Sequence, residues 1–238
     1  NHPALMDPVI VTAHLYKWFS PRAVADEDQV NRPFVRWLAR RLGVWALPDI
    51  RKHGIAVRPQ VEAVIREAVA DLNSGGNLIL YPSGHAYRTR YEDLRGNSAV
   101  QTMLRDVPGA RVVLVRTRGM WGSSFSYAQG VPNVGSAVRR AFRSVLANLL
   151  VFTPKRTVTI ELYEPDDLPR EAGRNEINAY LERFYNQDAP PNTYVPYTIW
   201  EESTQTTLPE PEPVKLGGSP EDVSAGTRGI VREYLHQL

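Results

Sequence analysis

Short apolar runs alternate with amphipathic segments along most of the chain, and this alternation limits the fold more than any other feature. The clearest helical segment, residues 58–76, repeats apolar side chains every three to four positions and ends at two glycines. The same periodicity predicts helices over 8–19, 31–43, 58–76, 97–106, 134–150 and 173–187, and strands over 44–50, 77–82, 110–119 and 156–165. Over 8–19 a β-branched run leaves a strand open, although a helix is favoured. We therefore expect an α/β fold, a layered domain with a mostly parallel central sheet flanked by helices.

The composition changes near residue 189, where Pro, Thr and Glu become frequent and the apolar periodicity ends. We expect the chain to divide into three consecutive parts. Residues 1–188 form the α/β domain. Residues 189–219 first wrap this domain through Tyr194, Tyr197 and Trp200 and then become a linker. Residues 220–238, with a short helix at about 220–237, could begin a further domain.

The overall composition is that of a globular protein, with 42% hydrophobic and 23% charged residues among 238. The chain has no cysteine, which excludes disulfides and thiolate metal sites, and no apolar run approaches the roughly 20 residues of a membrane-spanning helix. Arginine supplies 24 of the 28 basic residues. Arginine suits the binding of phosphate and carboxylate, but a coding bias with arginines on solvated faces explains the count equally well. The abrupt start suggests a segment of a longer protein, with further domains covalently linked.

The first seven residues, NHPALMD, place a histidine and a carboxylate five positions apart. On one continuous helix His2 and Asp7 would point about 140° apart and could not readily meet. Pro3, however, biases His2 away from the helical conformation, and Pro8 can begin a helix with Asp7 as its N-cap. A turn between them would let Asp7 bind one imidazole nitrogen and leave the other to take a proton from an alcohol. Taken alone the pattern is weak, because an N-terminal histidine is usually a surface residue and Asp before Pro is usually only a cap.

Three later stretches strengthen the interpretation of this pair. NHPALMD resembles the NHxxxxD block of the glycerolipid acyltransferases, the family that includes bacterial 1-acylglycerol-3-phosphate acyltransferase. ALPDIRKHG resembles the second block, with Arg51 in the place of the family's arginine. LYPSGHAYR (80–88) is similar to the third block, FPEGTR, and VVLVRTRG (112–119) to the fourth, an apolar VPV-type strand that runs into a glycine. Their order and approximate spacing agree over residues 1 to about 120.

The resemblance implies a glycerol-phosphate-acyltransferase-like fold and an O-acyltransferase activity. His2, paired with Asp7, would deprotonate the hydroxyl of a lysophospholipid resembling lysophosphatidic acid, and that oxygen would attack an acyl thioester of coenzyme A or acyl carrier protein. Backbone N–H groups at Ser83 and Gly84 could steady the oxyanion, and arginines would hold the acceptor's phosphate. The implied location is the cytoplasmic face of a membrane, as a peripheral protein or one anchored by regions outside this segment. We expect no cofactor, no metal and no nucleic-acid partner.

The third block departs from the family pattern. Ser83 stands where the family has glutamate, and an ungapped alignment puts His85 at the threonine position and Ala86 at the arginine position. The family's phosphate-binding arginine is therefore missing there, and Arg88 or Arg90 could replace it with help from Arg51. If they do not, the acceptor could be another lysophospholipid. Each of these arginines could equally be a surface residue paired with an acidic neighbour, Glu92 or Asp93.

Alternatives to the acyltransferase function remain. The same fold could be a noncatalytic lipid-binding or membrane-docking module whose altered third block has lost turnover. Ser83 as a hydrolase nucleophile is disfavoured, because Tyr81 occupies the first glycine position of a G-x-S-x-G elbow. The loop 119–130 suits either a lip around a lipid or pantetheine, or a packed loop with Trp121 in the core. The basic amphipathic helix 134–150 could rest on an anionic membrane surface, although a basic face is more often only solvated.

Overall fold

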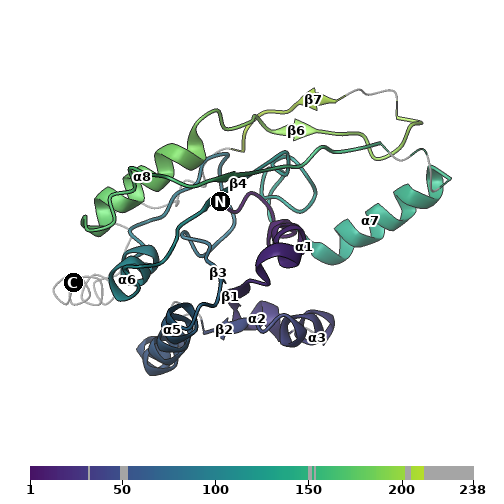
Figure 1. Ribbon diagram of the computed structural model, residues 1–238. Helices are drawn as coiled ribbons and strands as arrows, with labels where there is room; N and C mark the ends of the chain where they lie inside the picture. The colour runs from purple at the N-terminus through teal and green to yellow at the C-terminus, as the bar shows by residue number, and fades with distance from the viewer. Residues whose placement is uncertain (32, 49–52, 150–151, 153, 202–204, 212–238) are drawn as a thin grey trace, which may run out of the picture.

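The structure is a computed structural model that describes residues 1–31, 33–48, 53–149, 152, 154–201 and 205–211 of the 238-residue chain. It is a mixed α/β arrangement whose strands form three small sheets (Figure 1). The helices predicted within these residues are present, each within a few residues of its expected bounds. The helix predicted at about 220–237 and the linker residues 212–219 lie outside the described part of the chain.

A three-stranded parallel sheet forms one end of the molecule, with strand order β2-β1-β3. Its strands are β1 (Arg22–Asp26), β2 (Trp45–Leu47) and β3 (Leu78–Ile79). Parallel neighbours need long crossover connections, and helical segments supply both of them here. These segments are α2 (Glu27–Val30), α3 (Pro33–Arg41), the 3-10 turn η1 (Ile55–Val57) and α5 (Arg58–Asn73). The central strand, β1, has no counterpart among the predicted strands.

Strands β4 (Leu114–Arg118) and β5 (Thr159–Tyr163) form a separate antiparallel pair, with Leu114 opposite Tyr163 and Arg118 opposite Thr159. The expectation of a mostly parallel central sheet therefore holds only for β1, β2 and β3. Alternating helices and strands favour parallel pairing, but the excursion between β4 and β5 is about forty residues long and lets β5 return in either direction.

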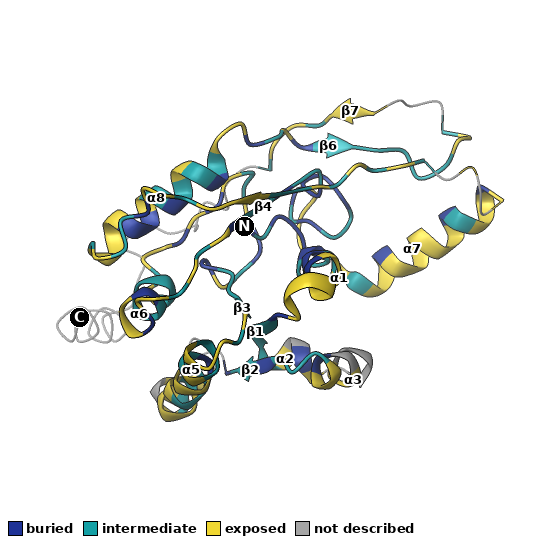
Figure 2. Cartoon of the chain, in the orientation of Figure 1, coloured by how far each residue is buried: buried dark blue, intermediate teal, exposed yellow. Residues whose placement is uncertain are grey.

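The largest apolar core lies between β4 and two helices, α6 (Ala99–Asp106) and α8 (Arg174–Asn186). Figure 2 shows buried and exposed residues alternating along α8, and its buried residues are Ile177, Asn178, Leu181 and Tyr185. The fully or nearly buried members of this core are Leu94, Leu104, Leu114, Leu168, Ile177, Leu181 and Tyr185. This core fixes β4, which carries one wall of the candidate site described below.

The described residues after 189 pack on the body of the protein. Strands β6 (Thr193–Tyr194) and β7 (Thr206–Thr207) pair antiparallel, and Glu210 accepts a hydrogen bond from the indole N–H of Trp121 at 2.9 Å. Glu210 therefore lies against the packed part of the protein. Trp121 is only 2% exposed and joins a small core with Tyr87. The loop 119–130 is thus a packed loop at Trp121, and the alternative of an exposed aromatic lip is wrong there.

Candidate active site

A turn followed by helix α1 (Asp7–Phe19) brings His2 and Asp7 together. The Asp7 N–H donates to the Ala4 carbonyl at 3.0 Å, and the helix begins at Asp7 with Pro8 in its first turn. The Nδ1 atom of His2 lies 3.8 Å from Oδ2 of Asp7, so the turn brings the two side chains near each other without a hydrogen bond between them. The N-cap is Met6, not Asp7 as expected. Asp7 instead stands in the first helical turn, where the helix dipole favours a negative charge.

Both members of this pair are withdrawn from solvent. The Asp7 side chain is 0% exposed and that of His2 is 14% exposed. A separation of 3.8 Å is longer than a hydrogen bond, and His2 Nδ1 and both Asp7 oxygens are buried without a hydrogen-bond partner. Catalytic hydrogen bonds are often long before substrate binds, so the separation is compatible with a dyad that tightens on binding.

The backbone around His2 is held by residues distant in sequence. The side chain of Asn1 accepts from the Thr117 N–H at 2.7 Å and donates to the Thr117 carbonyl at 3.1 Å, which ties it to β4. The His2 N–H donates to Glu92 Oε2 at 3.0 Å, and the His2 carbonyl accepts from the Tyr87 N–H at 2.9 Å. Hydrogen bonds to the His2 N–H and to the His2 carbonyl therefore fix the backbone that carries the imidazole.

Two hydroxyl groups and an aromatic ring complete the surroundings of the pair. The ring of Tyr81, just beyond β3, lies 4.7 Å from the His2 ring, centroid to centroid, at an angle of 45°. The hydroxyls of Tyr81 and of Thr117 on β4 lie close enough to Asp7 to lower the pKa of its carboxyl, although neither makes a hydrogen bond of normal geometry. The pair thus lies where the chain leaving β3 meets β4.

Burial shifts the two pKa values in opposite directions. It raises the pKa of Asp7 from 3.8 to about 6, opposed by the α-amino group of Asn1 and by the nearby hydroxyls. It lowers the pKa of His2 from 6.5 to about 3, with further contributions from the Asn1 amino group and His85. At neutral pH the imidazole is therefore uncharged and the carboxylate is ionised. These are the protonation states that a general base and its partner require.

The third-block loop gives the Gly84 N–H and the Ser83 hydroxyl partners within the loop itself. The Gly84 N–H donates to the Tyr81 carbonyl at 3.0 Å, with Gly84 in the left-handed region at φ 68°. That N–H is already engaged, so Gly84 does not offer the expected oxyanion donor in this conformation. The Ser83 hydroxyl is buried and donates to the His85 carbonyl at 2.9 Å, which makes it a loop-stabilising group.

The predicted phosphate-binding arginines are placed unequally. Arg88 is exposed, and its guanidinium lies 3.7 Å from the centroid of the Tyr127 ring. The guanidinium of Arg90 lies 4.8 Å from the Tyr91 ring, and its Nε is buried without a hydrogen-bond partner. Within the described residues neither forms an ion pair with Glu92 or Asp93, so the alternative of such pairs does not hold for them. Arg51 lies outside the described residues.

Glu92 is part of the site, although the sequence suggested only a surface role for it. The residue is 2% exposed; one carboxylate oxygen accepts from the His2 N–H, and the other is buried without a hydrogen-bond partner. Its backbone is bonded at both N–H and carbonyl to the side chain of Asn186 on α8, at 2.7 and 2.9 Å. The available signal was the alternation in YEDL, which puts Glu92 on the same side as the buried Leu94.

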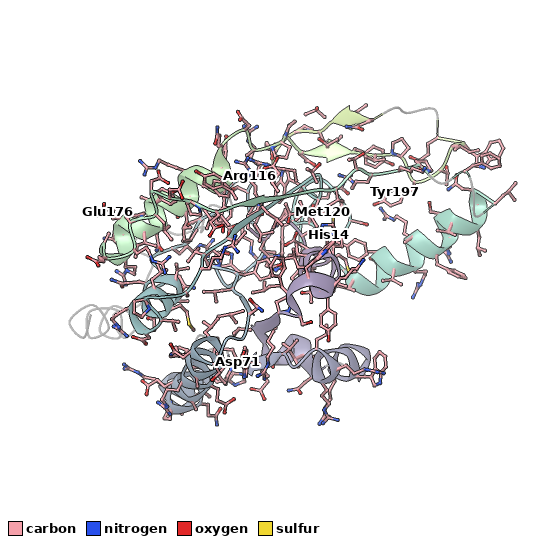
Figure 3. The ribbon with its side chains drawn as sticks, viewed as in Figure 1. His14, Asp71, Arg116, Met120, Glu176 and Tyr197 are labelled. Carbon is pink, nitrogen blue, oxygen red and sulfur yellow. The ribbon has the colours of Figure 1, made fainter. Side chains whose placement is uncertain are left out.

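A cleft of about 560 Å³ runs beside the helix that begins at Asp7. It is lined by Ile10, Ala13 and His14 of α1 and by Val158 and Ile160 at β5. Figure 3 labels His14 on this helix. At 1.5 Å of rise per residue, these α1 positions lie about 5 to 10 Å along the helix axis from Asp7. Four of the five lining residues carry apolar side chains.

The described residues contain neither a metal-binding cluster nor a membrane-spanning helix. No group of three or more histidine and acidic side chains in this part of the chain is arranged to hold a metal ion. Among its helices, none has the length and apolar character needed to cross a bilayer.

No family model matches the chain, and neither a curated protein nor a solved structure matches it significantly.

Proposed function

We propose that this chain is an O-acyltransferase that moves a fatty acyl group from a thioester of coenzyme A or acyl carrier protein to the hydroxyl of a lysophospholipid-type acceptor. The observation that carries the proposal is the buried pair His2 and Asp7, in which an uncharged imidazole faces a carboxylate 3.8 Å away. The four resembling sequence blocks support the choice of reaction. We place the reaction at the cytoplasmic face of a membrane, where such an acceptor resides.

In the proposed reaction His2 is the general base. Its Nδ1 is the nitrogen nearest Asp7, so Nε2 is left to accept the proton of the acceptor hydroxyl. The acceptor oxygen attacks the thioester carbonyl, and the tetrahedral intermediate expels the thiolate, which takes the proton back from His2. An ester and a free thiol result, and no acyl-enzyme is formed.

Asp7 stabilises the imidazolium that forms on His2 during this step. Opposite charges attract strongly when both are shielded from water, and the Asp7 side chain is fully buried. The low pKa of His2 describes the resting site, in which the imidazole is buried and lies near His85. A contraction of the 3.8 Å separation towards hydrogen-bond length would raise that pKa as the proton arrives.

The cleft beside α1 is our candidate for the acyl chain. Its lining is mostly apolar and it starts about one helical turn beyond Asp7. Ala13 and His14 on its wall are exposed, so the cleft is open to solvent. For the acceptor phosphate we propose Arg88 and Arg90, with Arg51 as a further candidate. Stacking on Tyr127 would hold the Arg88 guanidinium in one plane and leave its edge for two phosphate oxygens.

A noncatalytic lipid-binding module is the second candidate, and two observations favour it. The His2 side chain is only 14% exposed, and the Gly84 N–H is bonded within its own loop. In such a module the buried pair would stabilise the fold and have no chemical role. A third, weaker candidate is hydrolysis of the thioester or of the lipid.

Thioester consumption with and without a lysolipid acceptor separates these functions. The wild-type chain is incubated with labelled acyl-CoA, and in parallel with acyl carrier protein, against a panel of lysophospholipids. We expect labelled diacyl product only with an acceptor present, and its loss in His2→Ala. His53→Ala, a matched change at an exposed histidine to which we assign no role, should keep full activity. Acceptor binding without turnover would indicate the module, and release of free fatty acid without an acceptor would indicate a hydrolase.

A further inference from the structure

Helix α7 (Val134–Ala147) exposes its large apolar side chains instead of burying them. Val138, Phe142 and Leu146 are 55%, 65% and 53% exposed. They are four positions apart, so each lies about 40° around the helix from the one before, and together they form one stripe. Figure 2 shows α7 as mostly exposed, at one side of the molecule. We call Val138, Phe142 and Leu146 the outer stripe.

The opposite face of α7 is small and polar, and it is this face that packs on the protein. Ala137 and Ser144 are its buried residues, and the Ser144 hydroxyl donates to the Tyr197 carbonyl. Asn148, just past the helix, donates to the same carbonyl at 2.9 Å and accepts from the Ile199 N–H at 2.9 Å. Figure 3 labels Tyr197 next to this helix. These bonds hold the small polar face of α7 against the protein. The outer stripe, on the opposite side of the helix, therefore faces away from the body.

Charge and aromatic groups border the outer stripe. Arg139 and Arg143 are exposed on the side of α7 next to Leu146, and α7 contains no acidic residue. Arg140 lies on the other side of the helix, with its guanidinium 5.3 Å from the Tyr197 ring. At the end of the helix Trp200 donates its indole N–H to the Ala147 carbonyl at 3.0 Å, while 70% of the residue stays exposed. A ring with a fixed polar edge and an exposed apolar body is typical of residues at a membrane–water interface.

We propose that the outer stripe of α7, with its flanking arginines and Trp200, docks the protein on an anionic lipid bilayer. Apolar side chains that project from a helix at the side of the molecule suit insertion among lipid chains, while arginines beside them meet lipid phosphates. Charge complementarity therefore selects an anionic bilayer as the occupant. This inference goes beyond acyl transfer and does not depend on it, because no residue of the candidate active site lies on α7.

Vesicle flotation tests the docking. We expect the wild-type chain to float with phosphatidylcholine vesicles that contain phosphatidylglycerol, and to bind pure phosphatidylcholine much less. The double variant Phe142→Gln/Leu146→Gln should lose roughly tenfold or more in binding, because it removes two of the three apolar groups of the outer stripe. The matched control Val131→Gln/Leu162→Gln changes two exposed apolar residues off the helix and should bind like the wild type. Circular dichroism and thermal unfolding verify that both variants fold.

Two further measurements test the roles of the arginines and of Trp200. Arg139→Gln/Arg143→Gln should remove the preference for phosphatidylglycerol and most of the salt dependence. Vesicles should shift the tryptophan emission of the wild type to shorter wavelength, and Trp200→Phe should abolish this shift. His2→Ala should bind vesicles like the wild type, so a failure of acyl transfer and a failure of docking can be told apart.

Three outcomes would overturn the proposal. In the first, the Phe142→Gln/Leu146→Gln variant floats as well as the wild type. In the second, light scattering shows a dimer that this variant loses, which would assign the outer stripe to a second copy of the chain. In the third, the wild type ignores anionic vesicles but binds an acidic acyl carrier protein through the same residues.

Discussion

The Nδ1 atom of His2 and the Oδ2 atom of Asp7 lie 3.8 Å apart, and both are buried without a hydrogen-bond partner. Unmet hydrogen-bonding capacity in the interior costs free energy, so this arrangement does not maximise stability. It is held in place by bonds to the backbone of His2 from Glu92 and Tyr87. The fold thus holds His2 and Asp7 in place but leaves their hydrogen-bonding capacity unfilled. This arrangement is expected when the missing partner is a substrate or a proton.

The low pKa of His2 predicts how its replacement changes stability with pH. The folded protein binds the His2 proton only near pH 3, whereas the unfolded chain binds it near 6.5, so His2 destabilises the fold progressively as the pH falls through this window. His2→Gln should therefore gain stability relative to the wild type on acidification, by about 3 kcal/mol at pH 4 compared with pH 7. Urea unfolding of both proteins between pH 4 and 7 measures the difference. A difference that stays constant with pH would contradict the buried, uncharged imidazole.

Asp7 should show the opposite dependence. Its folded pKa of about 6 lies above the unfolded value of 3.8, so the carboxyl's favourable contribution is present below pH 3.8 and is lost as the pH rises to about 6. Asp7→Asn removes the charge and should raise the free energy of unfolding at pH 7 by about 1 to 3 kcal/mol, while acyl transfer falls. Chemical denaturation at pH 7 and pH 4 provides the comparison. If Asp7→Asn were instead strongly destabilised at pH 7, Asp7 would have a structural role.

Glu92 is predicted to act as a positioning residue for His2. Glu92→Ala removes the acceptor of the His2 N–H and should cost about 1 to 3 kcal/mol of stability and lower kcat. Glu92→Gln keeps an oxygen that can accept the same bond and should restore most of kcat. Equal kcat values for the two variants, with only stability affected, would show that Glu92 does not position His2.

The sequence predicts those features of the site that neighbouring residues determine, and misses those that depend on residues far along the chain. The turn at NHPALMD follows from two prolines within the stretch itself, and the structure brings His2 and Asp7 together there. The burial of Glu92 arises instead from Asn186, 94 residues further along the chain, and Trp121 is buried partly through Glu210, 89 residues away. Such partners leave no trace in a local pattern.

Strand β1 shows the same limit in the fold. Its sequence, RAVAD, has only three apolar residues between two charges and does not resemble a central strand. The structure accommodates Arg22 by stacking its guanidinium 3.7 Å from the Trp45 ring, with a 2.8 Å bond to the Gly43 carbonyl and an ion pair to Asp71 at 3.3 Å. Figure 3 labels Asp71 on α5. Because all three partners come from other elements, the strand could be recognised only in the folded chain.

The exposed guanidinium of Arg88 provides a test of acceptor binding. Arg88→Gln should raise the KM for a phosphate-bearing acceptor roughly tenfold and leave kcat nearly unchanged, since the contact would be made equally in substrate and transition state. The matched control is Arg95→Gln, an exposed arginine whose partner is Asp93 at 3.3 Å. Steady-state kinetics with lysophosphatidic acid and an uncharged monoacylglycerol would show whether the effect requires the phosphate. Identical changes for both acceptors would remove Arg88 from phosphate recognition.

A double-mutant cycle on kcat for acyl transfer shows whether His2 and Asp7 act as one base. His2→Ala should lower kcat by about 10³-fold or more and Asp7→Asn by about 10²-fold or more, and the double variant should be no slower than His2→Ala alone. We expect this non-additivity because the two side chains act as one unit. Losses that multiply in the double variant, or a His2→Ala protein that transfers acyl groups at the wild-type rate, would contradict it.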